Sequence, residues 1–481
     1  MPLPKNLKRS GAFTLALLFS VVFAGCAATN AKNGDAPPAG ATKTISEQVA
    51  AGSAAALSGS VTEITLGKAV QIKGDGAEAR GSEILITQTG NYRLSGSYDG
   101  RVRIEAGKGA VHLELVNAEI TSPAGAAIYA ANADQLDIVL AENTANTLTA
   151  AIAAVGEEEE KAALFSEVPL LLRGNGKLII TEAFRHGIAS DDTMIVQGGV
   201  YDITAATDGL HTNDEMIIQN GSFTLACGSD GMGSEKNLDI KDGLIKITKC
   251  EEGLESKEAL TVSGGSIEIT STDDGLNAGT AITVNGGAVL VHAEGDGLDS
   301  NGDITLNGGV LRVYSTGRGG EGALDIGDRT GSLRINGGDL VAVGMGLLAT
   351  PSAKSKQPYA AVGGTFAPGN QFRLKAGGTV AAETEIQGTG TMVLLSTPKL
   401  AEGKTYEAFL DDVSLGSGTV TGGALTIGSV TTGMGGMGGE RPLPEGFSRL
   451  DRGLPPEDFT FPEGRKPEEF TAPAGGTGGA A

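Results

Sequence analysis

A 22-residue repeat in the middle of the sequence strongly constrains the fold of this chain. Each copy holds an acidic residue, a glycine, an apolar residue and a polar step, then alternating apolar residues on both sides of a G-G or N-G turn. The glycines after the acidic residue recur every 22 residues from Gly209 to Gly297, and Gly187 extends the series upstream. A period of this length marks a stack of similar structural units.

The content of each copy favours strands. Alternating apolar pairs such as Ile282/Val284 and Val289/Val291 indicate short strands with one buried face. The copies lack the i, i+3, i+4 stripe of a helix, and the nine-residue spacing of the calcium-binding nonapeptide roll is absent. We therefore predict an all-β protein, a right-handed parallel β-helix with rungs of about 22 residues stacked roughly 4.8 Å apart.

The turns carry two further signals. Pairs of glycines recur at one turn, where positive φ is tolerated. Three asparagines precede such turns and predict an amide ladder inside the helix: Asn285, Asn307 and Asn336.

Composition changes along the chain divide it into five segments. Residues 1–25 combine a basic start with a short apolar run, which is typical of an export signal. They end in FAGC, which resembles the cleavage box of bacterial lipoproteins, so we expect a lipid on Cys26 and an exported protein anchored to the cell envelope. Secretion after a different cleavage is the alternative. We predict a signal peptide at 1–25, a flexible tether at 26–59, the β-helix at 60–345, a small C-terminal β cap at 346–430 and a disordered Gly/Pro/Glu-rich tail at 431–481.

The charge of the chain limits its partners. The 481 residues carry a formal net charge of −22 and include no tryptophan. This charge argues against nucleic acid and against direct binding to an anionic membrane surface. We expect a monomer that contacts a membrane only through its lipid.

Acidic and polar side chains fall into two columns when the copies are stacked in register. One column directly precedes the glycines, and the other follows three residues later. Like charges on adjacent strands repel by roughly 1 kcal/mol in water and by more at lower dielectric, so repeated carboxylates need a cation. The first column holds Asp208, Asp230, Glu252, Asp274 and Asp296, and the second holds His211, Gly233 as a gap, Glu255, Asn277 and Asp299, with Glu251 and Asp273 alongside and Glu321 and Asp325 as extensions.

Calcium suits these columns. Its bonds of about 2.3–2.6 Å place opposed oxygen ligands roughly 5 Å apart, near the spacing between rungs. Mg²⁺ demands a tighter octahedron, and oxygen-rich sites disfavour zinc. The alternative is a solvated Asp-Gly turn at each corner, which explains the first column well and the second less well. The predicted calcium ligands are Asp208, Asp230, Glu252, Glu255, Asp273, Asp274, Asn277, Asp296 and Asp299.

The positions of the histidines and cysteines point to structural roles. His211 lies in a polar column and could be a ligand, but we favour a solvated side chain for a single histidine among oxygen donors. His112, His186 and His292 are scattered and show no Cys/His metal-binding spacing. Cys227 and Cys250 are 23 residues apart, so they can lie on neighbouring rungs and form a disulfide. The alternative is a pair of buried thiols.

The repeat, read with LAENTANTL at 140–148 and LLRGNGKLIITEAFRHGIASDDTMIVQGG at 171–199, resembles a bacterial family across about residues 60–410. These are secreted or lipid-anchored carbohydrate-binding β-helix proteins, similar in fold to pectate lyases, that bind cellulose and acidic pectic polysaccharide. The resemblance implies calcium at Asp208, Asp230, Asp274 and Asp296. Glu252 departs from the usual Asp, and Gly233 leaves the second column empty.

We therefore expect calcium-dependent, non-catalytic binding of polygalacturonate or pectin, with cellulose as a further ligand, at the bacterial cell surface. A calcium-dependent pectate-type lyase is one alternative. It needs a base near the metal, and nothing marks Lys257, Arg312 or Arg318 as that base. A surface adhesin or spacer with structural calcium is the other. Aromatic stacking residues are few, with Tyr201 and Tyr314 in the repeat.

Overall fold

The structure is a computed structural model. It describes residues 57–430 apart from 58, 153–159, 318–320, 328–330 and 347–348.

Several predictions from the sequence lie outside these residues. They are the signal peptide at 1–25, the lipid on Cys26, nearly all of the tether at 26–59, and the tail at 431–481. The described part of the chain contains no helix with the length and hydropathy of a membrane span.

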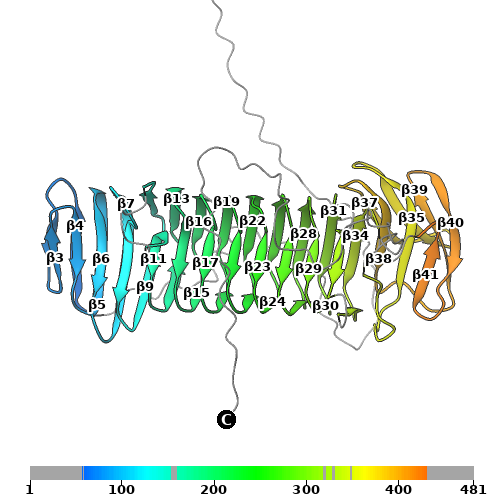
Figure 1. Ribbon diagram of the computed structural model, residues 1–481, viewed down its shortest axis with the longest axis horizontal. Helices are drawn as coiled ribbons and strands as arrows, with labels where there is room; N and C mark the ends of the chain where they lie inside the picture. The colour runs from blue at the N-terminus through cyan, green and yellow to red at the C-terminus, as the bar shows by residue number, and fades with distance from the viewer. Residues whose placement is uncertain are drawn as a thin grey trace, which may run out of the picture. The chain divides into compact units, whose positions relative to one another are not determined.

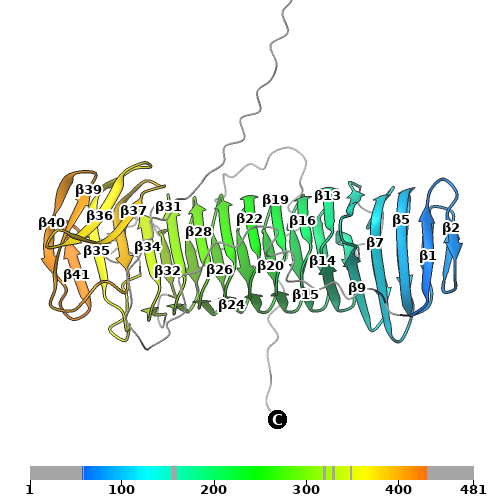
Figure 2. The ribbon, with the colours of Figure 1, turned by 180° about the vertical axis from the view of Figure 1, so that it is seen from behind.

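The described residues form strands that wind into stacked rungs (Figures 1 and 2). Three rows of strands run along the stack. The first row is a twelve-stranded sheet, parallel except for the β3–β4 hairpin. It contains β3 (Ala77–Arg80), β4 (Glu83–Ile86), β6 (Arg101–Glu105), β8 (Ile128–Asn132), β11 (Ala162–Ser166), β14 (His186–Ser190), β17 (Leu210–Thr212), β20 (Met232–Ser234), β23 (Leu254–Ser256), β26 (Leu276–Ala278), β29 (Leu298–Ser300) and β32 (Leu324–Ile326).

The second and third rows belong to one 25-stranded sheet, because β7 pairs with both β9 and β10 at the N-terminal end. The second row contains β9 (Gln135–Leu140), β12 (Leu170–Gly174), β15 (Met194–Val196), β18 (Met216–Ile218), β21 (Leu238–Ile240), β24 (Ala259–Val262), β27 (Ala281–Val284), β30 (Asp303–Leu306) and β33 (Leu333–Ile335). The third contains β10 (Ala145–Ala150), β13 (Lys177–Ala183), β16 (Val200–Ala205), β19 (Ser222–Cys227), β22 (Leu244–Lys249), β25 (Ser266–Ser271), β28 (Ala288–Ala293), β31 (Val310–Ser315) and β34 (Asp339–Gly344). The N-terminal end adds β1 (Val61–Leu66), β2 (Gln71–Lys73), β5 (Gly90–Asp99) and β7 (Ala110–Thr121).

A β cap follows the last rung. Strand β38 pairs antiparallel with β34, so it covers the hydrogen-bonding edge that the third row would otherwise leave open. The cap contains β35 (Tyr359–Phe366), β38 (Gly390–Ser396) and β41 (Ala424–Ile427), with a four-stranded antiparallel sheet of β36 (Gln371–Ala376), β37 (Thr379–Glu385), β39 (Thr405–Leu410) and β40 (Val413–Thr419). The prediction of an all-β parallel β-helix with a C-terminal β cap is confirmed.

The core consists of apolar columns that run from rung to rung. In the first row Leu254 pairs with Leu276, and Leu276 with Leu298, in exact 22-residue register. All three side chains are fully buried. Each rung therefore buries the apolar face of its neighbour, which is why the alternating pattern in the sequence persists along the stack.

Two glycine positions in each repeat have different physical causes. The second glycine of the G-G turn has positive φ, as at Gly287 (84°) and Gly309 (80°), so the prediction for this turn is confirmed. The glycine after the acidic residue is instead required by space. A Cβ on Gly275 would lie 2.2 Å from Val291 Cγ1 and 2.5 Å from the carbonyl oxygen of Gly297.

The predicted amide ladder forms at the surface. Asn307 Nδ2 donates to Asn285 Oδ1 at 2.8 Å, and Asn336 Nδ2 donates to Asn307 Oδ1 at 2.9 Å. The ladder is confirmed, but its predicted place inside the helix is wrong. Asn285 and Asn307 are exposed and Asn336 is partly buried, because the residue before each asparagine points into the core and the asparagine therefore points outward.

The two cysteines are buried free thiols rather than a disulfide. They directly follow the paired residues Ala226 and Lys249, so they lie on adjacent rungs as expected. Parallel neighbours keep their Cβ atoms roughly 4.8 Å apart, whereas a disulfide needs about 3.5–4.5 Å. Burial raises the pKa of Cys227 to about 12, so it remains a thiol at neutral pH.

Candidate metal-binding face

The second predicted column lies on the strands of the twelve-stranded sheet, and the acids predicted for the first column lie in the turns that lead into those strands, two residues before each strand begins. The second column is in direct register, with His211 opposite Gly233, Glu255 opposite Asn277, and Asp299 opposite Asp325. The first column lies three residues earlier in each rung. It starts one rung sooner than the sequence analysis placed it, because the register Ile188↔Leu210 sets His186 against Asp208.

Backbone hydrogen bonds fix the orientation of the first-column carboxylates. Asp274 Oδ1 accepts the backbone N–H of Asp296 at 2.7 Å, and Asp208 Oδ1 accepts that of Asp230 at 3.3 Å. Asp296 Oδ1 accepts the N–H of Gly322 on the next rung. In Asp208, Asp274 and Asp296 this contact holds one oxygen and leaves Oδ2 for other contacts.

Three clusters of potential ligands result, each built from two first-column neighbours and the second-column residue of the later rung. Within a cluster, the donor atoms lie within 4.8 Å of one another. The clusters are His186, Asp208 and His211 (the histidine cluster); Asp230, Glu252 and Glu255 (the middle acidic cluster); and Asp274, Asp296 and Asp299 (the distal acidic cluster).

The second column determines where the clusters form. Between Asp208 and Asp230 the second-column residue is Gly233, and between Glu252 and Asp274 it is Asn277. A third His or carboxylate donor is therefore missing from these two gaps. The predicted ligand Asp273 and its counterpart Glu251 are exposed and belong to none of the three clusters.

The distal acidic cluster holds carboxylates that resist ionisation. Burial raises the pKa of Asp274 to about 7, with the charges of Asp273 and Asp299 adding to the effect. Burial, followed by the charges of Asp274 and Asp325, raises the pKa of Asp296 to about 8 against the opposing N–H of Gly322. Burial likewise raises the pKa of Asp299. A divalent cation would remove this cost by neutralising the charges.

The middle acidic cluster has the same character. Burial, then the hydrogen bond to Glu255 and the charge of Asp208, raises the pKa of Asp230 to about 8. Burial and the charges of Glu255 and Asp274 raise the pKa of Glu252 to about 7. Glu252 Oε2 is buried and has no hydrogen-bond partner among the described residues. An unpartnered buried carboxylate oxygen is costly, and a bound cation would satisfy it.

The donor set and spacing of the two acidic clusters suit Ca²⁺. All the donors are carboxylate oxygens, which hard cations prefer. Two oxygens on opposite sides of a calcium ion lie about 4.6–5.2 Å apart, so donors within 4.8 Å of one another can share one ion. Mg²⁺ demands near-ideal octahedral geometry at about 2.0–2.1 Å and usually keeps several waters, so a site built from three protein carboxylates suits it less well.

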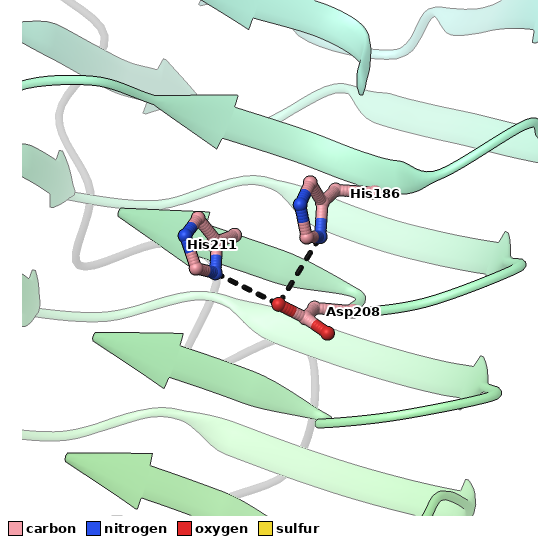
Figure 3. A group of neighbouring side chains, drawn as sticks. All are labelled: His186, Asp208 and His211. Carbon is pink, nitrogen blue, oxygen red and sulfur yellow. Dashed lines mark hydrogen bonds and ion pairs between the residues drawn. The ribbon is translucent and has the colours of Figure 1, made fainter. Parts of the chain in front are cut away.

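The histidine cluster is different. Asp208 Oδ2 lies 2.8 Å from His211 Nδ1 and 3.1 Å from His186 Nδ1 (Figure 3). Burial opposes ionisation of Asp208, but the hydrogen bonds from both histidines outweigh it and hold the pKa of Asp208 well below its usual range. Burial lowers the pKa of His186. The predicted calcium ligand Asp208 therefore faces imidazoles rather than oxygen donors.

The sequence analysis missed His186 and interpreted His211 as solvated. The structure packs the two rings face to face, with centroids 4.5 Å apart and an interplanar angle of 14°. A signal for His186 was present, because Gly187 belongs to the 22-residue series and the residue before each such glycine lies in the first column.

The residues considered for catalysis or sugar stacking are placed elsewhere or are already engaged. Lys257 forms an ion pair with Glu255, which outweighs partial burial and raises the pKa of Lys257. Arg312 lies in β31 of the third row and donates to backbone carbonyls, and Arg318 is outside the described residues. Tyr201 and Tyr314 are buried against Phe223 and His292, respectively, so neither forms an exposed platform.

Comparisons with known proteins point to one family. The model of the family described as "Carbohydrate-binding domain-containing protein" matches residues 80–250 and 247–397. A curated protein of Acetivibrio thermocellus with the same description is 30% identical over 137 residues, which are 27% of this chain and 48% of that protein. The chain thus spans about half the length of this relative. A solved structure described as a polysaccharide lyase-like protein from C. thermocellum, gadolinium derivative, is 24% identical with a TM-score of 0.38, covering 50% of this chain and 97% of the other.

Proposed function

This chain belongs to the family of carbohydrate-binding domain-containing proteins, and from that premise we propose that it binds acidic polysaccharide through calcium held on the twelve-stranded sheet. The proposal rests on the distal acidic cluster, where three carboxylates converge on one point in a protein of net charge −22. Such a surface would repel a uronate polymer unless a cation lies between them.

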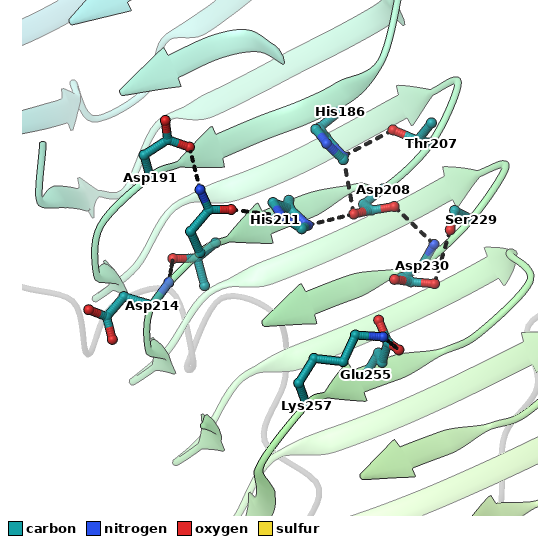
Figure 4. A network of polar contacts seen from close by, with 12 residues as sticks. His186, Asp191, Thr207, Asp208, His211, Asp214, Ser229, Asp230, Glu255 and Lys257 are labelled. Carbon is teal, nitrogen blue, oxygen red and sulfur yellow. Dashed lines mark hydrogen bonds and ion pairs between the residues drawn. The ribbon is translucent and has the colours of Figure 1, made fainter. Parts of the chain in front are cut away.

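Calcium would supply the link between protein and polymer. It takes six to eight oxygen ligands, and each acidic cluster contributes three residues. The remaining positions could accept carboxylate and hydroxyl oxygens of a uronate polymer. The first-row strands that carry or follow the cluster residues lie side by side along the stack (Figure 1), and Figure 4 shows His186, Asp208, Asp230 and Glu255 of the first two clusters one after another along it. Such a row of sites suits an extended ligand.

We propose binding without cleavage. A lyase needs a base beside the metal to remove a proton from the sugar. Lys257 is the basic residue beside the middle acidic cluster, and its ion pair with Glu255 keeps it protonated at neutral pH. We further propose export and a lipid anchor at Cys26, which rest on the sequence of residues 1–26.

The test is electrophoresis of the full-length chain through gels that contain polygalacturonate, with either calcium or a chelator. We expect the polymer to retard the protein only with calcium, and no new unsaturated ends to absorb in the ultraviolet. Retardation that is equal in chelator would contradict calcium bridging. Unsaturated ends would identify a lyase, and the absence of retardation in both gels would favour a spacer with structural metal. The same gels with cellulose in place of polygalacturonate test whether the protein also binds a neutral polysaccharide.

A further inference from the structure

We propose that the histidine cluster binds a divalent transition-metal ion of the zinc class, at a site separate from the calcium sites of the acidic clusters. The inference goes beyond the proposed function and does not depend on it, since it concerns His186, Asp208 and His211 alone.

The donor atoms select this class of metal. Two imidazole nitrogens and one carboxylate oxygen suit zinc and its neighbours, whereas calcium takes oxygen ligands almost exclusively. The same column position thus offers hard oxygen donors in the distal acidic cluster and nitrogen donors at His186. One face of the sheet carries two kinds of site.

The distances fit a tetrahedral ion after a small adjustment. Bonds of about 2.0–2.2 Å place tetrahedral ligands about 3.3–3.6 Å apart. Asp208 Oδ2 lies 2.8 Å and 3.1 Å from the Nδ1 atoms of His211 and His186. Outward movement of each donor by a few tenths of an ångström would admit the ion.

The hydrogen bonds behind His211 leave Nδ1 as the ring nitrogen that faces the shared point. Asn213 Nδ2 donates to Asp191 Oδ1 at 2.7 Å, which turns Asn213 Oδ1 toward His211 Nε2 at 3.3 Å. Asn213 Oδ1 can therefore accept an Nε2–H, while Nδ1 donates to Asp208 Oδ2 at 2.8 Å in the metal-free protein. A metal ion at the shared point would replace this Nδ1 proton and keep the Nε2–H on Asn213. Ligating histidines usually donate their other ring N–H to a fixed acceptor in this way.

His186 supplies an independent observation. The residue is only 5% exposed, and its Nε2 is buried without a hydrogen-bond partner among the described residues. Its Nδ1 makes polar contacts to Asp208 Oδ2 at 3.1 Å and to Thr207 Oγ1 at 3.0 Å. The ring is thus buried with its polar interactions directed at the shared point.

Gly233 leaves room for a further ligand on the metal. It occupies the second column on the next rung, where a Cβ would lie 3.1 Å from Asp230 Oδ2, 3.5 Å from Asp208 Oδ2 and 3.6 Å from His211 Nδ1. Because no Cβ fills the space between these atoms, a water molecule or ligand oxygen on the metal would face Asp230 Oδ2. Gly233 thus has two effects. It supplies no donor for an oxygen cluster, and it leaves the fourth coordination position of the metal open.

The test is a Zn²⁺ titration of the full-length, chelator-stripped chain by calorimetry with saturating calcium present. We expect one zinc ion per chain. His211→Asn should weaken its binding more than about tenfold, the least that loss of even an outer partner usually costs. Asparagine already occupies this column position at Asn277, so the substitution suits the rung. His292→Asn, which changes a half-buried histidine of the third row, is the matched control and should bind zinc normally.

A double comparison separates this proposal from the calcium proposal. Asp299→Asn should weaken calcium binding and leave zinc binding intact, and His211→Asn should do the reverse. Normal calcium binding by His211→Asn also shows that the variant is folded. Failure of the wild-type chain to bind calcium would overturn the proposed function and leave the zinc assignment standing.

X-ray absorption at the zinc edge identifies the ligand atoms in the zinc-loaded wild-type chain, so it does not depend on the folding of a variant. Scattering from imidazole rings is expected. Coordination by oxygen alone, unchanged zinc affinity in His211→Asn, or no zinc binding by the wild-type chain in the presence of calcium would overturn the proposal.

Discussion

Asp208 and Asp296 occupy the same position in two rungs, yet their surroundings move their pKa values in opposite directions. Both are buried, and burial alone disfavours the charged form. Asp208 is stabilised as an anion by two histidines, whereas Asp296 faces further carboxylates. The repeat therefore fixes where a carboxylate stands, and the second column and the neighbouring rung decide its chemistry.

The raised pKa values predict an inverted pH dependence for the metal-free protein. Asp230 and Asp296 titrate at about 8, and Glu252 and Asp274 at about 7. Unfolded carboxylates titrate near 4, so the folded state binds more protons between these values. Stability contributed by the protonated acids therefore falls as pH rises above about 4, and the fall ends once the folded acids have ionised, above about pH 8.

Thermal unfolding of chelator-stripped protein measures this effect. It should be followed between about pH 6.5 and 8.5, because His186, whose pKa is lowered, influences stability below about pH 6.5. The melting temperature should fall across this window and level off above it. Saturating calcium should remove most of the fall, since the ion replaces the protons. A melting temperature that rises with pH in the chelator-stripped protein would contradict the account.

Asp296→Asn should separate the structural and metal-binding roles of this side chain. The amide keeps an oxygen for the Gly322 N–H but removes a buried charge. Above about pH 8 the chelator-stripped variant should melt at a higher temperature than the wild type. Its calcium affinity should fall at least about tenfold. Asp239→Asn, on the second row and paired with Lys241, is the control, and equal calcium affinity in the two variants would count against the distal site.

At the scale of single residues, the sequence analysis identified the acidic side chains that the structure brings together, and it missed the histidines. Asp274, Asp296 and Asp299 are visible because the same residue type recurs at a fixed spacing. His186 and His211 are not, because their proximity depends on a change of residue type within a column. Only treating Gly187 as a full member of the series would have aligned them.

At the level of the strand and turn, the repeat is governed by how closely the rungs approach. The glycine after each acidic residue looks like a turn glycine in the sequence. In the structure it has no positive φ, and it is required because the next rung's backbone and an inward side chain occupy the space of a Cβ. The place of the asparagine ladder was misjudged, and the choice between a disulfide and free thiols at Cys227 and Cys250 was left open, for a related reason. A 22-residue period identifies which residues are neighbours on adjacent rungs, but it does not say which way their side chains point.

Gly275→Ala tests this steric requirement. Its Cβ would lie 2.2 Å from Val291 Cγ1, so the variant should lose about 1–3 kcal/mol of unfolding free energy, as overpacked cores do. Urea unfolding with calcium present measures the loss. Gly346→Ala is the control, because a Cβ there meets no described heavy atom within 4 Å. Equal midpoints for the two variants would show that the rungs can separate at little cost.

For the whole described stack, one period sets both the fold and the spacing of its carboxylates. Period and alternation were sufficient to predict the parallel β-helix, because each unit can bury its apolar face only against a copy of itself. The same stacking brings buried acids together in a chain of net charge −22. We infer that calcium is both the counterion that makes this arrangement stable and the link to an acidic ligand.

Calorimetric titration of the full-length, chelator-stripped chain with Ca²⁺, repeated with polygalacturonate present, tests this claim most directly. Calcium should bind and release protons at pH 7, and the polymer should bind only when calcium is present and should raise the affinity for it. Absence of calcium binding, or binding of the polymer that is as strong in chelator as in calcium, would contradict the account.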